Sequence, residues 1–308
     1  MADLKSIRTR IRSVQSIKKI TRAMELIATS RIVKAEQRVG ESRSYAVAMA
    51  RVLGNLAAAT GGAVQHPLLE RHEETKASAV LVLCSDRGLC GPYNTGVLKL
   101  AEEAFAELPG TNKSVVAVGR KASSYFGYRK MPILQVFDGI SDNPSYADAK
   151  RVADFLIEKY LTEELDHIEM VYTSFHSQVR QSLRSTSFLP IDTSELSEVE
   201  EKGGKAALHT PVAAETSDAV TADTLFEPDA AGILEVLIPK GIQSRLYSAM
   251  LDAAASEHTA RRRAMKAATD NAGELVDALT LQYNKARQAA ITTEILEVVS
   301  GAEALATA

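Results

Sequence analysis

The sequence predicts an α/β domain with a mainly parallel, Rossmann-like sheet, joined to a long antiparallel coiled coil formed by the N- and C-terminal helices. Two observations support this prediction. All nine prolines lie between positions 67 and 239, so both ends of the chain are free of proline over long stretches. The middle of the chain alternates short apolar runs with amphipathic segments, which is typical of a parallel sheet covered by helices on both faces.

The composition is that of a globular protein of one or two domains. The chain has 308 residues, of which 45% are hydrophobic and 24% charged, with a net charge of −3. The longest apolar run, 79–84, is far shorter than the roughly 20 residues that a membrane-spanning helix needs. The N-terminus lacks the apolar core of a secretory signal, and two cysteines fit a reducing compartment.

The first 60 residues are expected to form one arm of the coiled coil. An apolar stripe recurs there at steps of three and four: Leu4, Ile7, Ile11, Val14, Ile17, Ile20, Met24 and Ile27. Because three successive steps are of three residues, we expect a locally overwound, irregular coil. Residues 1–39 carry ten Lys or Arg against three Asp or Glu, so the polar face of this helix is basic.

Residues 77–191 are expected to form the α/β domain. The predicted strands are Ala79–Cys84, Ser114–Val118, Ile133–Phe137, Ile168–Phe175 and Arg180–Phe188. The predicted helices are Thr95–Leu108, Lys121–Phe126 and Tyr146–Leu165. Residues 192–227 follow as an acidic, solvated insertion, since the stretch from Asp192 to Asp229 has ten acidic residues and two basic ones.

Residues 228–308 are expected to form the second arm, with an interruption at Pro239–Gly241. Its stripe is rich in alanine, which favours close packing against the N-terminal helix. At about 1.5 Å per residue the first arm reaches about 80 Å and the second about 115 Å, so roughly the last 20 residues have no partner within the chain. That end is apolar and has no basic residue from position 290 onward, which indicates burial inside another protein.

No motif for catalysis or cofactor binding is found. The turn Ser85–Gly96 stands between a strand and a helix, where α/β folds often bind phosphate, but it matches neither G-x-G-x-x-G nor the P-loop. Cys84 and Cys90 have the spacing of neither a redox pair nor a zinc site, and the six histidines are scattered. We therefore expect no enzymatic activity, cofactor or metal.

Three segments together resemble the gamma subunit of the rotary ATP synthase of bacteria. They are Ile17–Ile32 (IKKITRAMELIATSRI), Ser85–Asn94 (SDRGLCGPYN) and Tyr283–Ala304 (YNKARQAAITTEILEVVSGAEA). The resemblance covers nearly the whole chain except Asp192 to about Thr224. It implies a central shaft whose terminal helices enter a head of alternating alpha and beta subunits, while the α/β domain lies against the epsilon subunit and the membrane c ring.

The resemblance also implies contact residues. Those that match the segments facing the alpha and beta head are Met24, Arg31, Lys34, Arg287, Gln288, Thr292, Glu294, Ile295 and Val299, and Ile291, Leu296 and Leu305 would join them in an apolar sleeve. Those on the lower domain that would contact epsilon or the c ring are Asp86, Arg87, Cys90 and Tyr93. The shaft would be a peripheral protein on the cytoplasmic face of the cell membrane, touching the membrane only through its partners.

Two other readings stay open at this stage. A coiled-coil adaptor or a nucleic-acid-associated rod would also have a basic helix and an apolar tip. The overall acidity and the scarcity of aromatic residues argue against nucleic acid as a partner. An enzyme of the α/β domain would need a pocket with perturbed titratable groups.

Overall fold

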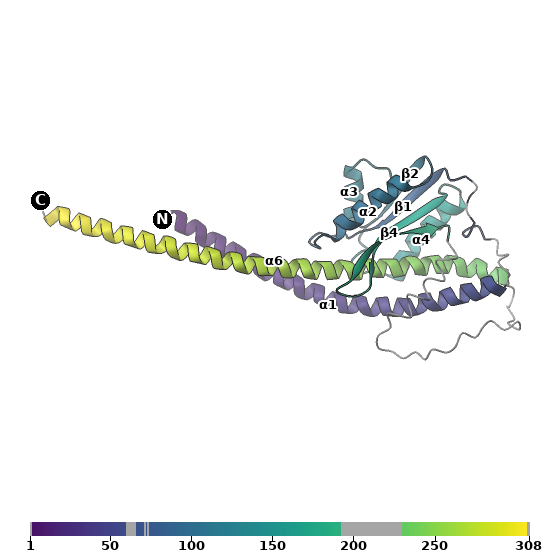
Figure 1. Cartoon of the computed structure of the whole chain (residues 1–308), viewed down its shortest axis with the longest axis horizontal. Coiled ribbons are helices and arrows are strands. Elements are labelled where there is room, and N and C mark those ends of the chain that lie inside the picture. The colour runs from purple at the N-terminus through teal and green to yellow at the C-terminus, as the bar shows by residue number, and fades with distance from the viewer. Residues whose placement is uncertain (1, 60–65, 71, 73, 192–229, 307–308) are drawn as a thin grey trace. The chain divides into compact units, whose positions relative to one another are not determined.

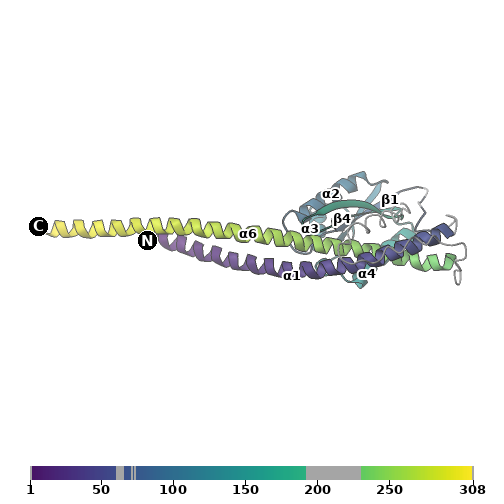
Figure 2. The same cartoon turned by 60° about the horizontal axis from the view of Figure 1, so that its bottom comes forward.

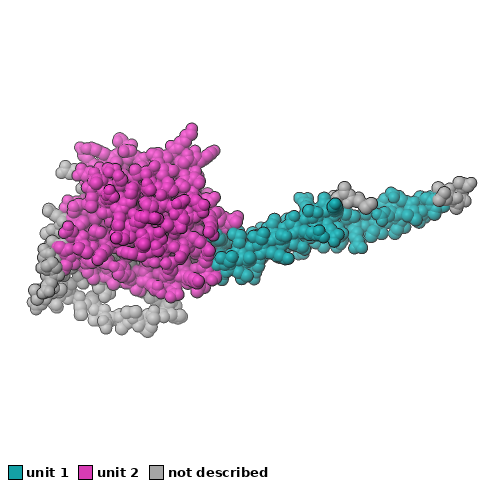
Figure 3. Space-filling model, turned by 180° about the vertical axis from the view of Figure 1, so that it is seen from behind, with its two compact units in different colours: residues 1–29, 261–308 teal, residues 30–260 magenta. Residues whose placement is uncertain are grey.

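The computed structural model describes residues 2–59, 66–70, 72, 74–191 and 230–306. The chain forms two compact units, shown in Figure 3: unit 1 comprises residues 1–29 and 261–308, and unit 2 comprises residues 30–260. The boundary falls within both terminal helices, α1 (Ala2–Ala59) and α6 (Ala230–Ala306). The predicted acidic insertion 192–227 lies outside the described residues.

Unit 2 contains the predicted α/β domain, with its elements in the predicted order. They are β1 (Ala77–Leu83), α2 (Tyr93–Glu107), β2 (Asn112–Val118), α3 (Arg120–Tyr128), β3 (Ile133–Phe137), α4 (Tyr146–Leu161), β4 (His167–Phe175) and β5 (Gln181–Leu189). The five strands form one sheet in the order β3-β2-β1-β4-β5. The first four strands are parallel and β5 is antiparallel to β4, which confirms the mainly parallel sheet.

Helices cover both faces of this sheet, as Figure 1 shows. In the central strand β1, Leu81 and its alternate neighbours pack with α4 and the first part of α6, including Leu156 and Leu246. Val80 and Val82 point the other way and pack with α2 and α3. Every residue of β1 is buried, because successive side chains in a strand alternate between two covered faces.

In unit 1, residues 2–29 of α1 pair with α6 from residue 261 to about residue 286. Thr269 donates a hydrogen bond to Thr21 over 2.8 Å, and the Lys18 side chain lies beside Gly273. Moving toward the N-terminus of α1 therefore moves toward the C-terminus of α6, so the pair is antiparallel, as predicted. Figures 1 and 2 show these two segments side by side, with the end of α6 continuing past the N-terminus.

The predicted irregular stripe on α1 is wrong in its second half. Ile17, Ile20 and Ile27 are each more than half exposed, and the buried positions at this level are Thr21 and Ala28. The helix stays α-helical throughout. A helix has 3.6 residues per turn, so successive steps of three residues move around it and carry the isoleucines away from the face that contacts α6. The positions on that face, which form the seam of the coiled coil, keep a seven-residue spacing and hold smaller residues.

On α6 the buried positions of unit 1 also repeat every seven residues. Met265, Ala272 and Leu279 are buried, as is Thr269 between them. The small side chains on both helices permit the close axial approach that the alanine-rich stripe predicts. The alanines are not all on this seam, however, because Ala249 and Ala253 pack into the core of the α/β domain.

The predicted interruption at Pro239–Gly241 is also wrong, because α6 runs through it without a break. A proline inside a helix costs about 3 kcal/mol, since it removes one hydrogen bond and crowds the preceding turn. Ile238, Ile242 and Leu246 flank this position and are almost fully buried against the sheet. At about 1.5–3 kcal/mol for each buried side chain, their burial outweighs the proline penalty.

Candidate interaction surfaces

The last turns of α6 form an exposed apolar surface in unit 1. Because Thr21 lies opposite Thr269, the first residues of α1 lie opposite a position near residue 286 of α6, and the residues beyond have no partner on α1. Residues 291–302 are all exposed. The large apolar side chains among them are Ile291, Ile295, Leu296, Val298 and Val299, with exposed fractions of 42–72%. This confirms an unpartnered apolar tip, although the side chain of Leu305 lies outside the described residues.

The other predicted contact residues of unit 1 are also accessible. Arg287, Gln288, Thr292 and Glu294 are exposed on α6, and Met24 on α1 is half-buried beside the seam. The Thr292 hydroxyl donates to the carbonyl oxygen of Gln288 over 3.0 Å. This surface therefore offers a cation, an amide and a carboxylate next to the apolar tip.

The two predicted contact residues of unit 2 on α1 differ from each other. Lys34 is exposed. Arg31 instead forms an ion pair with Asp142, in the loop between β3 and α4, and its side chain is 40% exposed. The Arg31 guanidinium is thus already engaged within the chain, a contact that sequence reasoning did not find.

Asp142 also contacts α6. The Nε2 atom of His258 donates to the backbone carbonyl oxygen of Asp142 over 3.0 Å, and lies 4.0 Å from its Oδ1 atom. His258 is only 2% exposed. One loop residue therefore joins α1 and α6 to the α/β domain. No sequence signal could have indicated this, because the three residues are more than 100 positions apart.

The turn after β1 contains the four residues predicted to contact epsilon or the c ring, and Asp86 is its anchor. Its carboxylate accepts hydrogen bonds from the backbone N–H groups of Arg120, Gly139 and Ser141 and from the Ser141 hydroxyl, over 2.9–3.1 Å. Burial alone would raise the pKa of Asp86, but these hydrogen bonds outweigh burial and hold the pKa below its usual value. Asp86 thus ties the end of β1 to the segments that follow β2 and β3.

Two more of these four residues are buried in internal contacts. Cys90 is 1% exposed and lies 3.1 Å from the Asn94 amide nitrogen, which donates to it. Tyr93 donates from its hydroxyl to the carbonyl oxygen of Ala253 on α6 over 3.2 Å. Arg87 is the one of the four with an exposed side chain. Of these four residues, Arg87 is therefore the one whose side chain is accessible to another subunit.

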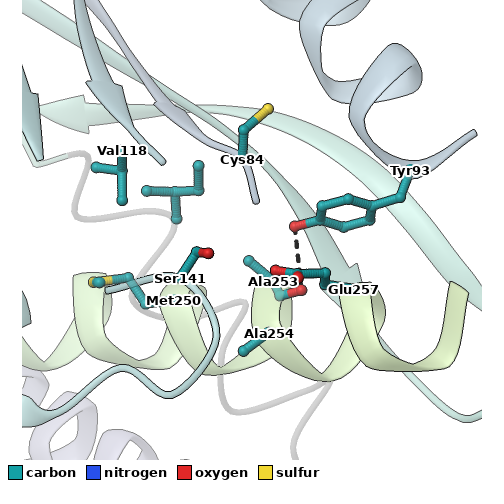
Figure 4. A pocket seen from close by; sticks show the side chains of 9 residues that line it. Cys84, Tyr93, Val118, Ser141, Met250, Ala253, Ala254 and Glu257 are labelled. Carbon is teal, nitrogen blue, oxygen red and sulfur yellow. Dashed lines mark hydrogen bonds between the residues drawn. The ribbon is translucent and has the colours of Figure 1, made fainter. Parts of the chain in front are cut away.

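Helix α6 packs across the carboxyl ends of β1 and β2. Figure 4 shows the small cavity that remains, and its lining residues are Leu83, Cys84, Tyr93, Val118, Ser141, Met250, Ala253, Ala254 and Glu257. Its volume is about 10 Å³, which is close to the space that one water molecule occupies. Burial raises the pKa of the Cys84 thiol far above its usual value, which disfavours the thiolate form at neutral pH.

A half-buried carboxylate that sequence reasoning missed lies where α1, β4 and α6 meet. Asp252 accepts a hydrogen bond from the Ser174 hydroxyl over 3.1 Å, and Arg43 lies 3.8 Å away. Burial raises the pKa of Asp252 to about 6, although Arg43, the Phe175 amide and Ser174 each lower it. Arg43 also donates to the Phe175 carbonyl oxygen over 2.5 Å.

The described residues contain no cluster of three or more His, Cys, Asp or Glu able to hold a metal ion. Among the described helices, none has an apolar stretch long enough to cross a membrane. The exposed apolar surface of the described residues in unit 1 lies at the end of a long helix, a feature typical of proteins that bind other proteins through their helices.

Comparison with known proteins identifies the family. The ATP synthase family model matches residues 3–305, and the chain belongs to that family. The chain is 44% identical to the ATP synthase gamma chain of Cutibacterium acnes and 42% identical to that of Mycolicibacterium smegmatis, in each case over 99% of this chain and 98% of the relative. Gamma chains are non-catalytic stalk subunits of ATP synthase, so the earlier adaptor and nucleic-acid readings have no support.

Solved structures share the fold. A chain of the Euglena gracilis mitochondrial ATP synthase, from a structure of OSCP, F1 and the c-ring, superposes with a TM-score of 0.63 at 17% identity, over 99% of this chain and 95% of that one. A chain from the central stalk and c-ring of the Tetrahymena thermophila enzyme gives 0.59 at 20% identity, over 81% and 99%.

Proposed function

We propose that this chain is the central rotor shaft of a proton-translocating ATP synthase. It would couple rotation of the membrane c ring to conformational changes at the nucleotide sites of the beta subunits, for ATP synthesis and, in reverse, for hydrolysis. The observation that carries this proposal is the exposed apolar end of α6 in a chain that matches gamma chains over nearly its whole length.

The apolar tip suits a rotating contact. Ile295, Leu296 and Val299 offer contacts without direction, and such contacts resemble one another at every angle of rotation. Hydrogen bonds and ion pairs depend on orientation and contribute roughly 1–3 kcal/mol each. Polar contacts of Arg287, Gln288 and Glu294 with the alpha and beta head would therefore favour particular dwell angles without locking the rotor.

The α/β domain would face epsilon and the c ring. We infer that Arg87 belongs to that contact, while Asp86, Cys90 and Tyr93 shape the turn that presents it. The chain would then lie on the cytoplasmic face of the cell membrane as a peripheral protein, with membrane contact only through its partner subunits.

Native mass spectrometry of complexes captured by a tag on this chain, from gently solubilised membranes of its own cell, tests the proposal. We expect a particle with three copies each of two nucleotide-binding subunits and a single copy of this chain. A homo-oligomer of the chain, or a complex with nucleic acid, would contradict the proposal.

Met24→Lys provides a functional test. Met24 is half-buried beside the seam, and a cation there would add an orientation-dependent contact with the head. We expect ATP-driven proton pumping to fall relative to ATP hydrolysis, measured in inverted membrane vesicles. Met24→Leu keeps the size and lacks the charge, so it should remain coupled, and normal coupling in Met24→Lys would count against this contact.

A further inference from the structure

We propose that Asp142 is a positioning residue that transmits torque between the α/β domain and the two long helices. This inference rests on the proposed function of the chain as a shaft. A shaft must resist sliding between the domain that is turned and the helices that turn the head. The contacts of unit 2 show where that resistance lies.

The two helices are attached to the α/β domain in different ways. The first part of α6 is embedded in the core through Ile238, Ile242 and Leu246, whose apolar side chains pack with β1 and α4. On α1, Ala35 and Val39 pack with α6 and with Phe175 at the end of β4, and the half-buried Met49 packs against the core of the α/β domain. These apolar contacts of α1 are few, and polar contacts with two turns of the α/β domain stand beside them.

These polar contacts come from two faces of α1: Arg31 and Arg38, two turns apart, reach the loop between β3 and α4, and Glu36 reaches the turn between β4 and β5. Arg31 pairs with Asp142, Arg38 donates to the Asn143 side chain, and Glu36 accepts from the Gln178 amide over 3.1 Å. Apolar surfaces slide past one another with little directional preference, whereas hydrogen bonds weaken steeply when their geometry is distorted. The polar set is thus the part of the junction that resists movement of α1 along the domain.

Asp142 stands out in this set because it touches both helices. Its carboxylate holds Arg31 on α1, and its carbonyl oxygen accepts from His258 on α6. A load applied to the loop at Asp142 is therefore shared between the two arms.

The loop that carries Asp142 is itself held at both ends. On one side, Ser141 exchanges hydrogen bonds with Asp86, in which the Asp86 amide donates to the Ser141 hydroxyl over 2.8 Å and the Ser141 amide donates back to the carboxylate. On the other side, Ser145 and Asp148 form a capping box at the start of α4. Asp142 is thus connected to the end of β1 and to α4 by short, directional contacts.

The test uses the assembled complex in inverted membrane vesicles, with Asp142→Asn as the variant and Asp138→Asn as the control. Asp138 lies in the same loop and is exposed. We expect Asp142→Asn to lower the ratio of proton pumping to ATP hydrolysis by roughly twofold or more, and Asp138→Asn to leave it unchanged. A role in stability alone would reduce the amount of assembled complex without changing this ratio.

Exchanging the charges of Arg31 and Asp142 tests whether these two side chains act as a pair. Arg31→Asp should uncouple, and the double variant Arg31→Asp with Asp142→Arg should recover part of the ratio. If Arg31 instead acts by contacting the head, the double variant will not recover. Normal coupling in Asp142→Asn, or no recovery in the exchange, overturns the proposal.

Assembly is checked in the same vesicles by native mass spectrometry. If Asp142→Asn does not assemble, Asp142→Glu is measured, and failure of both to assemble assigns Asp142 to folding alone and overturns the proposal. A wild-type chain found outside a complex with three copies each of two nucleotide-binding subunits would instead refute the proposed function. Failure of the Asp142 proposal and failure of the proposed shaft function therefore give different results.

Discussion

Replacing Asp86 with alanine separates an internal role of this residue from a role in contacting another subunit. Its carboxylate accepts four hydrogen bonds that connect three segments of unit 2. Two donors, the amides of Arg120 and Gly139, are on exposed residues where water can replace the carboxylate, so each loss costs about 0.5–1 kcal/mol. The two donors of Ser141 are part-buried, and each of these losses costs about 1–2 kcal/mol.

We therefore expect Asp86→Ala to lower the free energy of unfolding of the purified chain by about 2–4 kcal/mol at pH 7, allowing for partial additivity within one network. Urea denaturation followed by circular dichroism measures this difference. Asp138→Ala is the control, because substitutions at exposed positions change stability by less than about 0.5 kcal/mol.

The pH dependence checks the same reasoning. The pKa of Asp86 in the folded chain lies below its ordinary value. Its stabilising contribution is therefore fully present above about pH 4 and is lost as the pH falls through the folded pKa. The difference between wild type and Asp86→Ala should narrow in acid. A loss below about 1 kcal/mol at pH 7, or a difference that does not change with pH, would refute the internal role.

Two further predictions concern unit 2. Gly119 has a φ of +93°, and a Cβ atom there would lie 2.2 Å from the carbonyl oxygen of Cys84. Gly119→Ala should therefore lower the free energy of unfolding by about 3 kcal/mol or more, whereas Gly127→Ala, at a position in α3 with open space around it, should not. Equal melting temperatures for the two variants would contradict this prediction. The raised pKa of Asp252, about 6, means that its contribution to stability is present at low pH and is lost as the pH rises from about 4 through 6, by about 3 kcal/mol. Asp252→Asn should remove this slope in melting temperatures measured from pH 4.5 to 7.5, and an unchanged slope would show that another group is responsible.

Much of the architecture could be predicted from the sequence because it depends on local patterns. Strand β3 has the predicted bounds, and the other strands differ from prediction by one or two residues at one or both ends. Alternation of apolar residues and the spacing of prolines are patterns that span only a few neighbouring positions, so the sequence shows them directly. The greater length of α6 compared with α1 follows from the number of residues in each helix and the rise per residue. The exposed tip at 291–302 follows from these same features.

The contacts within each unit were decided by the tertiary structure. Ile20 and Thr21 are neighbours in the sequence, yet the larger apolar side chain is exposed and the smaller polar one is buried, because the partner helix approaches on only one side. The helix through Pro239 persists because Ile238 and Ile242 are buried against a sheet that lies far away in the sequence.

The hydrogen bonds and ion pairs of Asp86 and Asp142 show most clearly what the sequence alone does not reveal. Asp86 looked like a surface residue of a turn, and Asp142 had no motif around it, yet both connect segments that are distant in the chain. A hydrogen bond requires atoms within about 3 Å and a defined angle, and neither is encoded by the residues adjacent to a donor or acceptor. The sequence by itself determined the elements, their order and the apolar end of α6. Only the folded chain decided which helix faces are buried and which side chains hold α1 and α6 to the α/β domain, because those depend on three-dimensional proximity between distant residues.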